Sequence, residues 1–343
     1  MELIAAPPSA DHIAAAFGLG APAGPLRPVA GGESHRVWRL ETAAGVFAVK
    51  ELNRPHSNPG WVAWFERAFR FEQAAFDAGI PIPRPVPVAS TGLCLAELPG
   101  AGETSLTVRV HAWVEGAKVE GRGHTPDDAR GVGAMLARIH ALAQPADAPP
   151  AELLRTYGEA HWRTLVERTS AADVPWAPYL AGCLVAIDEL EAFVIAARAN
   201  GGVQVLSHRD AAPRNVLRTP DDTLVLIDWD SAGPEIPQQE AARALIEWAQ
   251  VDDTILGADL ARALIDGYRD AGGEFGRRRR ADFAGFISKE LVWLEFNVRR
   301  ALGERLLDAS DRALGDRKAR EMLARVPAFG ALLDSAAELW CST

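Results

Sequence analysis

The sequence predicts an α+β fold with two lobes, in which an N-terminal lobe of antiparallel strands and one helix precedes a larger, mainly helical C-terminal lobe. The chain has 343 residues, of which 48% are hydrophobic, so it is long enough to bury a large core in each lobe. Short strand patterns with glycine turns occupy residues 28–116, and apolar residues at helical spacing dominate residues 125–200 and 239–340. We expect the lobes to cover residues 1–111 and 112–343.

In the N-terminal lobe, residues 11–18 predict a short helix with Asp11 as its N-cap. Residues 29–40 indicate two strands joined by a tight turn, and residues 45–52 indicate a third strand. In such a turn, backbone amides can approach phosphate oxygens because the side chains are small, as they are at Gly31, Gly32 and Ser34. Taken alone, these residues are also typical of an ordinary hairpin turn.

The third strand carries a candidate functional lysine. Lys50 falls on the same face of this strand as apolar residues, where a charged group needs a partner. Residues 61–78 then predict an amphipathic helix, which ends before a proline-rich stretch and offers two acids, Glu66 and Glu72.

The C-terminal lobe follows a strand expected at residues 108–116. Thr125, followed by Pro126, predicts the start of a helix that runs to residue 142. Further helical patterns lie at residues 150–169, 179–200 and 239–252 and within residues 258–340. In this last region the apolar spacing favours core positions over a ligand platform for the aromatic residues Trp293, Phe296 and Trp340.

The most informative segment lies between residues 205 and 230. An apolar strand leads to Asp210, and Asn215 opens a second strand, which a turn at residues 219–223 connects to a third strand that ends at Asp228. This arrangement would hold Asp210, Asn215 and Asp228 at one rim. Two oxygen ligands suit Mg2+, which leaves its other positions to water and phosphates, while a third carboxylate can orient an attacking hydroxyl.

The spacing His208-Arg-Asp-x-x-x-x-Asn215, followed by Leu226-Ile-Asp-Trp-Asp230, resembles the aminoglycoside phosphotransferase and choline kinase family, whose fold is protein-kinase-like. The resemblance extends to the glycine turn, to the strand that ends at Lys50 and to the helix that carries His140, whose role there is structural. It covers residue 28 to about residue 250. The family usually has Gly in place of Arg209 and Asp near Glu240, so the roles of these two residues stay open, together with those of Arg214 and Asp230.

The resemblance implies a kinase that transfers a phosphoryl group from ATP or GTP, with Mg2+, to a hydroxyl of a small molecule. Asp210 would be the catalytic carboxylate, and Asn215 and Asp228 would hold the metal. The nucleotide would contact Gly31, Gly32, Ser34, Lys50 and a hinge that includes Ala112 and Val114. Glu72 would pair with Lys50, with Glu66 as the alternative. A nucleotide-binding pseudokinase and a protein kinase are the rival hypotheses, and the missing long activation segment weakens the second.

The composition limits the classes of binding partner and the cellular location that we expect. A net charge of -10 and a pI near 5.4 argue against nucleic acid, and the three cysteines indicate neither a disulfide framework nor a zinc site. The chain shows no leader pattern and no apolar run of membrane-spanning length, so we expect a cytoplasmic protein. In residues 151–343 acids outnumber bases by 31 to 23, which favours a cationic acceptor such as an aminoglycoside, a basic peptide antibiotic or choline. A sugar, a nucleoside antibiotic and an amino alcohol stay open, and the sequence does not indicate an oligomeric state.

Overall fold

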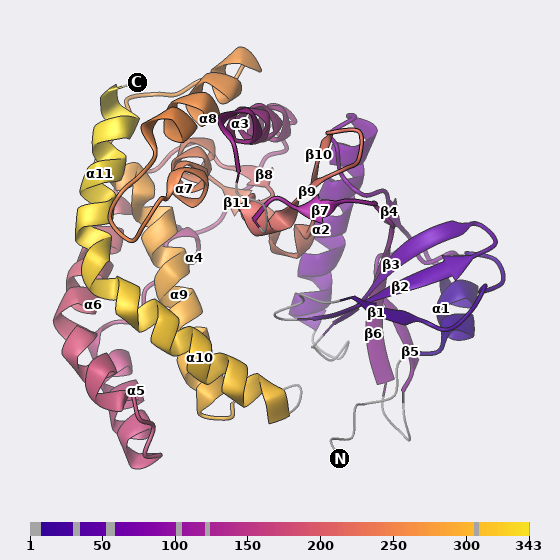
Figure 1. Ribbon diagram of the computed structural model, residues 1–343, viewed down its shortest axis with the longest axis horizontal. Coiled ribbons are helices and arrows are strands. Elements are labelled where there is room, and N and C mark those ends of the chain that lie inside the picture. The colour runs from indigo at the N-terminus through magenta and orange to yellow at the C-terminus, as the bar shows by residue number, and fades with distance from the viewer. Residues whose placement is uncertain are drawn as a thin grey trace. The chain divides into compact units, whose positions relative to one another are not determined.

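The chain forms two compact units in a computed structural model that describes residues 8–29, 35–52, 59–100, 105–120, 124–304 and 309–342 (Figure 1). The first unit comprises Met1–Arg122 and Arg214–Gly233. The second comprises Gly123–Pro213 and Pro234–Thr343. The first unit thus extends past the boundary expected at residue 111 and includes a segment from the middle of the chain.

An antiparallel sheet forms the centre of the first unit. Its strands are β1 (Arg27–Val29), β2 (Arg36–Thr42), β3 (Gly45–Leu52), β4 (Pro85–Val86), β5 (Ala96–Pro99) and β6 (Ser105–Ala112). They run in the order β1-β2-β3-β6-β4, and β5 also pairs with β6. Two helices accompany the sheet, α1 (Ala10–Phe17) and α2 (Pro59–Asp77). Together with the mainly helical second unit, this sheet confirms the predicted α+β class.

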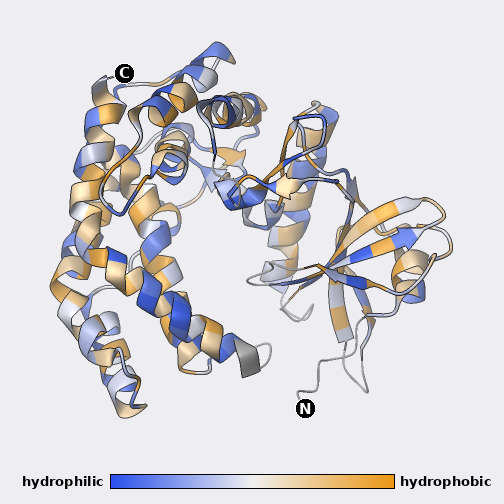
Figure 2. Cartoon of the chain, viewed as in Figure 1, coloured by the Kyte–Doolittle hydropathy of each residue, from blue (hydrophilic) through white to orange (hydrophobic). Residues whose placement is uncertain are grey.

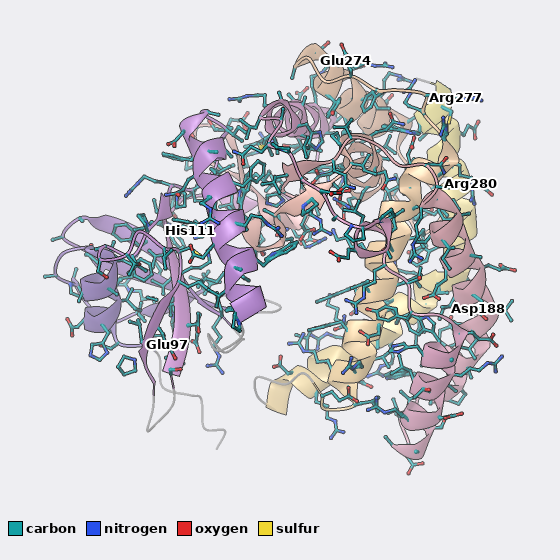
Figure 3. All side chains as sticks on the ribbon, turned by 180° about the vertical axis from the view of Figure 1, so that it is seen from behind. Glu97, His111, Asp188, Glu274, Arg277 and Arg280 are labelled. Carbon is teal, nitrogen blue, oxygen red and sulfur yellow. The ribbon has the colours of Figure 1, made fainter. Side chains whose placement is uncertain are left out.

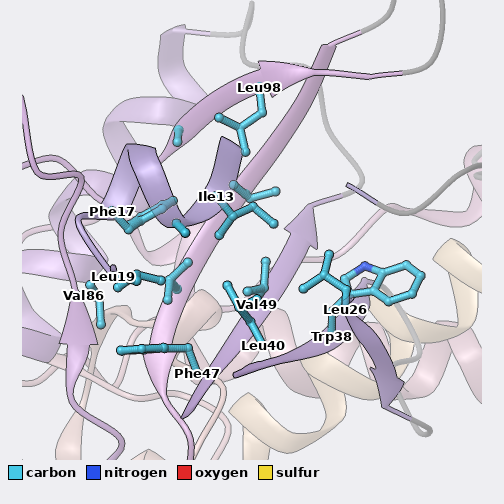
Figure 4. Packing of buried hydrophobic residues seen from close by; sticks show 14 of the residues in the cluster. Ile13, Phe17, Leu19, Leu26, Trp38, Leu40, Phe47, Val49, Val86 and Leu98 are labelled. Carbon is cyan, nitrogen blue, oxygen red and sulfur yellow. The ribbon is translucent and has the colours of Figure 1, made fainter. Parts of the chain in front are cut away.

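The alternation of side chains along the strands gives the sheet two different faces. Phe47 and Val49 of β3 belong to the same buried core as Val108 and Val110 of β6. Figure 4 shows Phe47 and Val49 in this core with Ile13 and Phe17 of α1. The opposite face carries the alternate residues of the two strands. These include Lys50 of β3 and Arg109 of β6, which lie directly opposite each other. On that side, a smaller apolar cluster joins β3 to α2 through Leu52, Phe65, Phe69, Cys94 and Leu95.

A second small sheet brings the middle of the chain into the first unit. Its strands are β7 (Ala117–Lys118), β9 (Val216–Arg218) and β10 (Leu224–Leu226), in the order β10-β9-β7. β9 and β10 form the predicted hairpin, in which the amide of Thr219 donates to the carbonyl of Thr223. The amide of Leu226 also donates to the carbonyl of Pro81, which ties the hairpin to the chain after α2.

The second unit is mainly helical. Its helices are α3 (Pro126–Ala141), α4 (Pro150–Leu153), α5 (Glu159–Ala171), α6 (Ala177–Ala197), α7 (Pro237–Ala249), α8 (Ala258–Asp270), α9 (Ala284–Ala301), α10 (Ala309–Arg325) and α11 (Phe329–Ser342). The strand β8 (Val205–Ser207) pairs with β11 (Gly233–Glu235). Hydrophilic residues dominate α10 (Figure 2), which also carries ion pairs such as Arg320–Asp316. No helix of the described part of the chain is long and apolar enough to cross a membrane.

Three local predictions need correction or refinement. The N-cap of α1 is Ser9, whose hydroxyl accepts from the amide of His12, and not Asp11, which lies within the first turn. Residues 150–169 do not form one helix, because Gly158 has a φ of +82° immediately before α5. Trp340 is fully buried as expected, whereas Trp293 and Phe296 are half-buried and stack with ring centroids 5.2 Å apart. By contrast, Thr125 caps α3 as predicted and forms a capping box with Asp128.

Residues 277–280 are four consecutive arginines, and two of them make specific side-chain contacts. The guanidinium of Arg278 lies over the rings of Phe275 and Trp340, and Arg280 pairs with Asp334 of α11. Figure 3 labels Arg277 and Arg280 in this region of the second unit. These contacts give the run a structural role beside α11.

Candidate active site

The first unit carries a row of basic side chains on one face of its sheet. In the register of β3 and β6, Lys50 lies opposite Arg109, and Ala48 lies opposite His111. Like charges directly opposite one another on antiparallel strands repel. This face therefore requires carboxylates close by.

Those carboxylates come from α2 and from the segment after β10. Glu72 of α2 forms an ion pair with Arg109, and its Oε1 lies 2.9 Å from Nε2 of His111, which is labelled in Figure 3. Nη1 of Arg109 lies 2.5 Å from Oδ1 of Asp230. Nζ of Lys50 lies 2.7 Å from Oδ1 of Asp228 and 2.5 Å from Oδ2 of Asp230.

This network corrects the predicted partner of Lys50. Glu72 is held by Arg109 and His111, and Lys50 is held by Asp228 and Asp230, so Lys50 and Glu72 form no ion pair among the described side chains. Glu66, the alternative, accepts hydrogen bonds from the amide of Cys94 at 3.0 and 3.2 Å. The prediction was wrong because Arg109 binds Glu72. The guanidinium of Arg109 pairs with both Glu72 and Asp230, so Glu72 is held by Arg109 in place of Lys50.

Burial and charge act in opposite directions on these groups. Burial by itself would lower the pKa of Lys50, but the charges of Asp228 and Asp230 outweigh burial, and the pKa is raised. Burial would raise the pKa of Asp230, yet the charges of Lys50 and Arg109 hold it well below its usual range. The pKa of Glu72 is likewise lowered, because Arg109 and His111 outweigh burial. At neutral pH, Lys50, Glu72 and Asp230 are therefore all charged.

Asn215 and Asp228 lie together at the open end of the β9–β10 hairpin. Asn215 precedes β9, Asp228 follows β10 by two residues, and the amide of Ile227 donates to the carbonyl of Asn215 at 2.8 Å. Asn215 is buried, whereas the side chain of Asp228 is 43% exposed and open to a ligand. An amide oxygen and a carboxylate are the donors that Mg2+ prefers, so this pair fits the predicted metal. No cluster of three or more His, Cys, Asp or Glu suited to a metal occurs among the described residues.

Of the other residues predicted to contact the nucleotide, the structure describes Ala112 and Val114 but not the glycine turn. Gly31, Gly32 and Ser34 lie outside the described residues. In the expected hinge, the amide of Ala112 donates to the carbonyl of Arg84, and the amide of Trp113 donates to Val46. Val114 lies two residues after the end of β6, and a contact of Ala112 or Val114 with a nucleotide stays a prediction.

The loop that carries Asp210 belongs to the second unit. It follows β8, and α7 anchors it: Oε1 of Glu240 accepts from the amide of Arg209 at 2.5 Å, and Nε1 of Trp248 donates to the carbonyl of Ala211 at 2.7 Å. The amide of Asp210 lies 3.2 Å from Nδ1 of the fully buried His208. The fixed backbone of this loop sets the position from which the half-buried Asp210 side chain projects.

Glu240 is the centre of a buried network. Its Oε2 lies 2.9 Å from Nε2 of His140, whose Nδ1 lies 2.9 Å from the hydroxyl of Tyr268, and Nη2 of Arg243 lies 3.5 Å from Oε1. Burial would raise the pKa of Glu240, but its hydrogen bond to His140 and the charges of His140 and Arg243 keep it below the usual range. His140 is therefore structural, as the resemblance implies, and Glu240 supports the Asp210 loop.

Lys289 of α9 completes the surroundings of Asp210. Its Nζ lies 2.6 Å from Oδ1 of Asp210 and 2.8 Å from Oε1 of Glu247 of α7. We did not predict this contact from the sequence, because α9 reads only as an amphipathic helix. Arg109 was also missed, although its signal is present: Arg109 and His111 alternate with valines in β6, as Lys50 alternates with apolar residues in β3.

The first unit holds a half-buried lysine paired with acids and a hairpin that presents Asn215 and Asp228, and the second unit holds an anchored loop that carries Asp210. These are the features expected from the resemblance to kinase-like phosphotransferases. Comparison with known families gives the same answer. A sequence model of the phosphotransferase enzyme family matches residues 25–283, so the chain belongs to this family, and the resemblance noted from the sequence is confirmed. No curated protein matches the chain by sequence.

Solved structures show the same fold at low sequence identity. A spectinomycin phosphotransferase in complex with ADP and spectinomycin superposes with a TM-score of 0.64 and 14% identity, covering 94% of this chain and 97% of that chain. A microcompartment-associated aminopropanol kinase gives 0.59 and 17%, covering 92% and 94%. The choline kinase of Streptococcus pneumoniae gives 0.55 and 14%, covering 90% and 95%.

Proposed function

We propose that this protein is a small-molecule kinase that transfers the γ-phosphoryl group of ATP or GTP to a hydroxyl of its acceptor, with Mg2+. In this reaction the acceptor oxygen bonds to the γ-phosphorus, the bond from that phosphorus to the β-phosphate oxygen breaks, and the hydroxyl proton leaves. The products are a phosphate ester and a nucleoside diphosphate. Catalysis of this kind consists mainly of positioning and charge stabilisation.

The observation that carries the proposal is the pairing of Lys50 with Asp228 beside Asn215. A raised pKa keeps the Lys50 ammonium charged, so it can bind phosphate oxygens. Asn215 and Asp228 offer the oxygen donors for Mg2+, which would neutralise phosphate charge when bound. A binding module has no need of such a metal pair together with the separately anchored carboxylate of Asp210, which weighs against the pseudokinase alternative.

Asp210 acts on the acceptor in this proposal. Its carboxylate would accept a hydrogen bond from the acceptor hydroxyl and receive its proton. Lys289 lies between Asp210 and Glu247, and this group of two carboxylates and one ammonium has a net charge of -1. Together with the excess of acids in residues 151–343, this charge favours a cationic acceptor, either an antibiotic or a metabolic amine such as choline or an amino alcohol. We place the reaction in the cytoplasm, in keeping with the free thiols of Cys94, Cys183 and Cys341.

The proposal is tested by incubating the purified protein with Mg2+, ATP or GTP and a panel of hydroxyl compounds. The panel includes spectinomycin, other aminoglycosides, aminopropanol, choline, sugars and a generic protein-kinase substrate. Mass spectrometry should show one compound that gains a phosphoryl group. Phosphorylation of the protein substrate alone would support the protein-kinase alternative, and nucleotide binding without any turnover would support the pseudokinase.

Asp210→Asn is the decisive variant, because it keeps the shape of the side chain and removes the proton acceptor. We expect kcat to fall by about two to four orders of magnitude, while nucleotide affinity measured by calorimetry changes little. The matched control is Asp259→Asn in α8, where the Asp259 side chain is 85% exposed, and we expect it to have wild-type turnover. Near-wild-type turnover of Asp210→Asn would contradict the role assigned to this loop.

A further inference from the structure

Lys289 connects Asp210 to a second carboxylate that the proposed reaction does not use. Its Nζ contacts Oδ1 of Asp210 at 2.6 Å and Oε1 of Glu247 at 2.8 Å. The three residues come from the loop after β8, from α7 and from α9, all within the second unit. Tertiary packing therefore brings together Lys289 and Asp210, which are 79 positions apart in the sequence.

These three side chains are shielded more than an ordinary surface pair. The exposed fractions are 29% for Lys289, 18% for Asp210 and 11% for Glu247. Water screens a pair of this exposure less than it screens a fully solvated pair. An ammonium has three N–H donors, so Lys289 can hold both carboxylates at once.

We propose that Lys289 is a positioning residue for phosphoryl transfer, which fixes the Asp210 carboxylate in the orientation that receives the acceptor hydroxyl, and that Glu247 in turn fixes Lys289. This inference rests on the proposed function. The torsion that rotates an aspartate carboxylate has broad energy wells, so the anchored backbone of the loop does not by itself fix the oxygens. Lys289 supplies such a constraint by holding Oδ1.

Orientation of this kind affects the rate strongly, since a displacement of about 1 Å at a reacting group can cost on the order of 100-fold. The ammonium also affects protonation. A positive neighbour makes a carboxylate harder to protonate, and a negative neighbour makes it easier. Lys289 and Glu247 therefore act on Asp210 in opposite directions, and Nδ1 of His208 accepts from the backbone amide of Asp210.

The test compares Lys289→Met with wild type, using phosphate release from ATP with water as acceptor and transfer to any acceptor found in the screen. We expect kcat to fall by about 10- to 100-fold, with the nucleotide Kd within about two-fold of wild type. We also expect the acid limb of the pH–rate profile to move up by about one pH unit. Glu247→Gln should move this limb in the opposite direction, because it removes a negative neighbour. The matched control is Lys318→Met in α10, since Lys318 is 27% exposed and pairs with Glu321 at 3.4 Å.

Chemical rescue separates positioning from folding. Lys289→Cys should be as slow as Lys289→Met, and treatment with bromoethylamine, which restores an ammonium at this position, should recover most of kcat. Treated wild type controls for reaction at the exposed Cys341. An unchanged kcat in Lys289→Met, or a folded Lys289→Cys that aminoethylation does not rescue, would overturn the inference while leaving the proposed function standing. Absence of turnover in wild type would instead overturn the proposed function itself.

Discussion

One predicted site residue in each unit has a left-handed backbone conformation, which residues other than glycine rarely adopt. Arg209 has a φ of +67° and Asp228 a φ of +68°. Such a conformation costs a non-glycine residue roughly 1 to 2 kcal/mol. The position of Arg209 usually carries Gly in the family that the sequence resembles, and the backbone explains that preference. Contacts made by the surrounding structure, such as the Arg209 amide with Glu240, keep the loop in place in spite of the strain.

The strain at Arg209 can be measured by comparing Arg209→Gly with Arg209→Ala. Both variants lose the contact of Nε with Glu235, which is 4.0 Å long, but only glycine adopts the left-handed conformation freely. We expect Arg209→Gly to be more stable than Arg209→Ala by about 1 kcal/mol in urea denaturation. Equal stabilities would show that the loop relaxes to another conformation when the side chain is shortened.

At the residue scale, the sequence predicts a role for residues that stand in short motifs. It does not reveal residues whose role depends on tertiary contacts. Lys50, Asn215 and Asp228 were predicted because each occupies a defined place in a strand or at its end. Lys289 was not, because nothing in α9 distinguishes it from a solvated lysine until the packing of α9 against α7 and the Asp210 loop is known. The partner of Lys50 was predicted wrongly for the same reason, since the choice depends on where Arg109 lies.

At the scale of elements, the pairing of β3 with β6 requires the acids that surround it. Lys50 and Arg109 face each other across the two strands, and Arg109 is 2% exposed at its side chain. A buried guanidinium without carboxylates would be very unfavourable. Glu72 and Asp230 therefore join α2 and the segment after β10 to this sheet through charge as well as through apolar packing.

Removal of Arg109 should be far more costly than removal of a surface arginine. Arg109→Met leaves Glu72 buried without its main partner, and we expect a loss of about 3 to 5 kcal/mol of unfolding free energy. The matched control is Arg130→Met, because Arg130 is 47% exposed and its pair with Asp270 should contribute about 1 kcal/mol or less. Urea denaturation measures both.

A double variant distinguishes a stranded charge from lost packing at Arg109. Adding Glu72→Gln to Arg109→Met removes the uncompensated charge, so the double variant should be more stable than Arg109→Met alone. The destabilisation of the double variant could instead equal the sum of those of the two single variants. Lost packing around the guanidinium would then explain the effect of Arg109→Met, and the unpaired charge would not.

At the scale of the whole molecule, the order of elements along the chain predicted two lobes but not which segments belong to each unit. Periodicity identified most of the strands and helices, because local spacing determines them. The assignment of residues 214–233 to the first unit depends instead on long-range contacts, such as β7 with β9 and the amide of Leu226 with Pro81. Spacing within a segment carries no information on such partners.

Acid should destabilise the molecule through three carboxylates that are buried or half-buried. Glu72, Asp230 and Glu240 all have pKa values held below the usual range in the folded protein. Each therefore stabilises the fold fully above the pKa of the unfolded chain, about 4, and loses that contribution as the pH falls toward the folded value. Between pH 7 and pH 5 these groups should leave stability nearly constant, and the loss should begin below about pH 4.5.

Glu240→Gln tests this pH dependence at the centre of the second unit's network. The variant keeps the shape of the side chain but breaks a buried charged network with His140 and Arg243, so at pH 7 we expect a loss of roughly 3 to 5 kcal/mol. The difference from wild type should narrow as the pH falls from 5 to 3, because wild type then begins to lose the contribution that the variant already lacks. Glu338→Gln at an exposed position of α11 is the control, and its free energy of unfolding should follow wild type within about 0.5 kcal/mol at every pH. A Glu240→Gln difference that stays constant from pH 7 to pH 3 would show that the ionised carboxylate does not stabilise the fold.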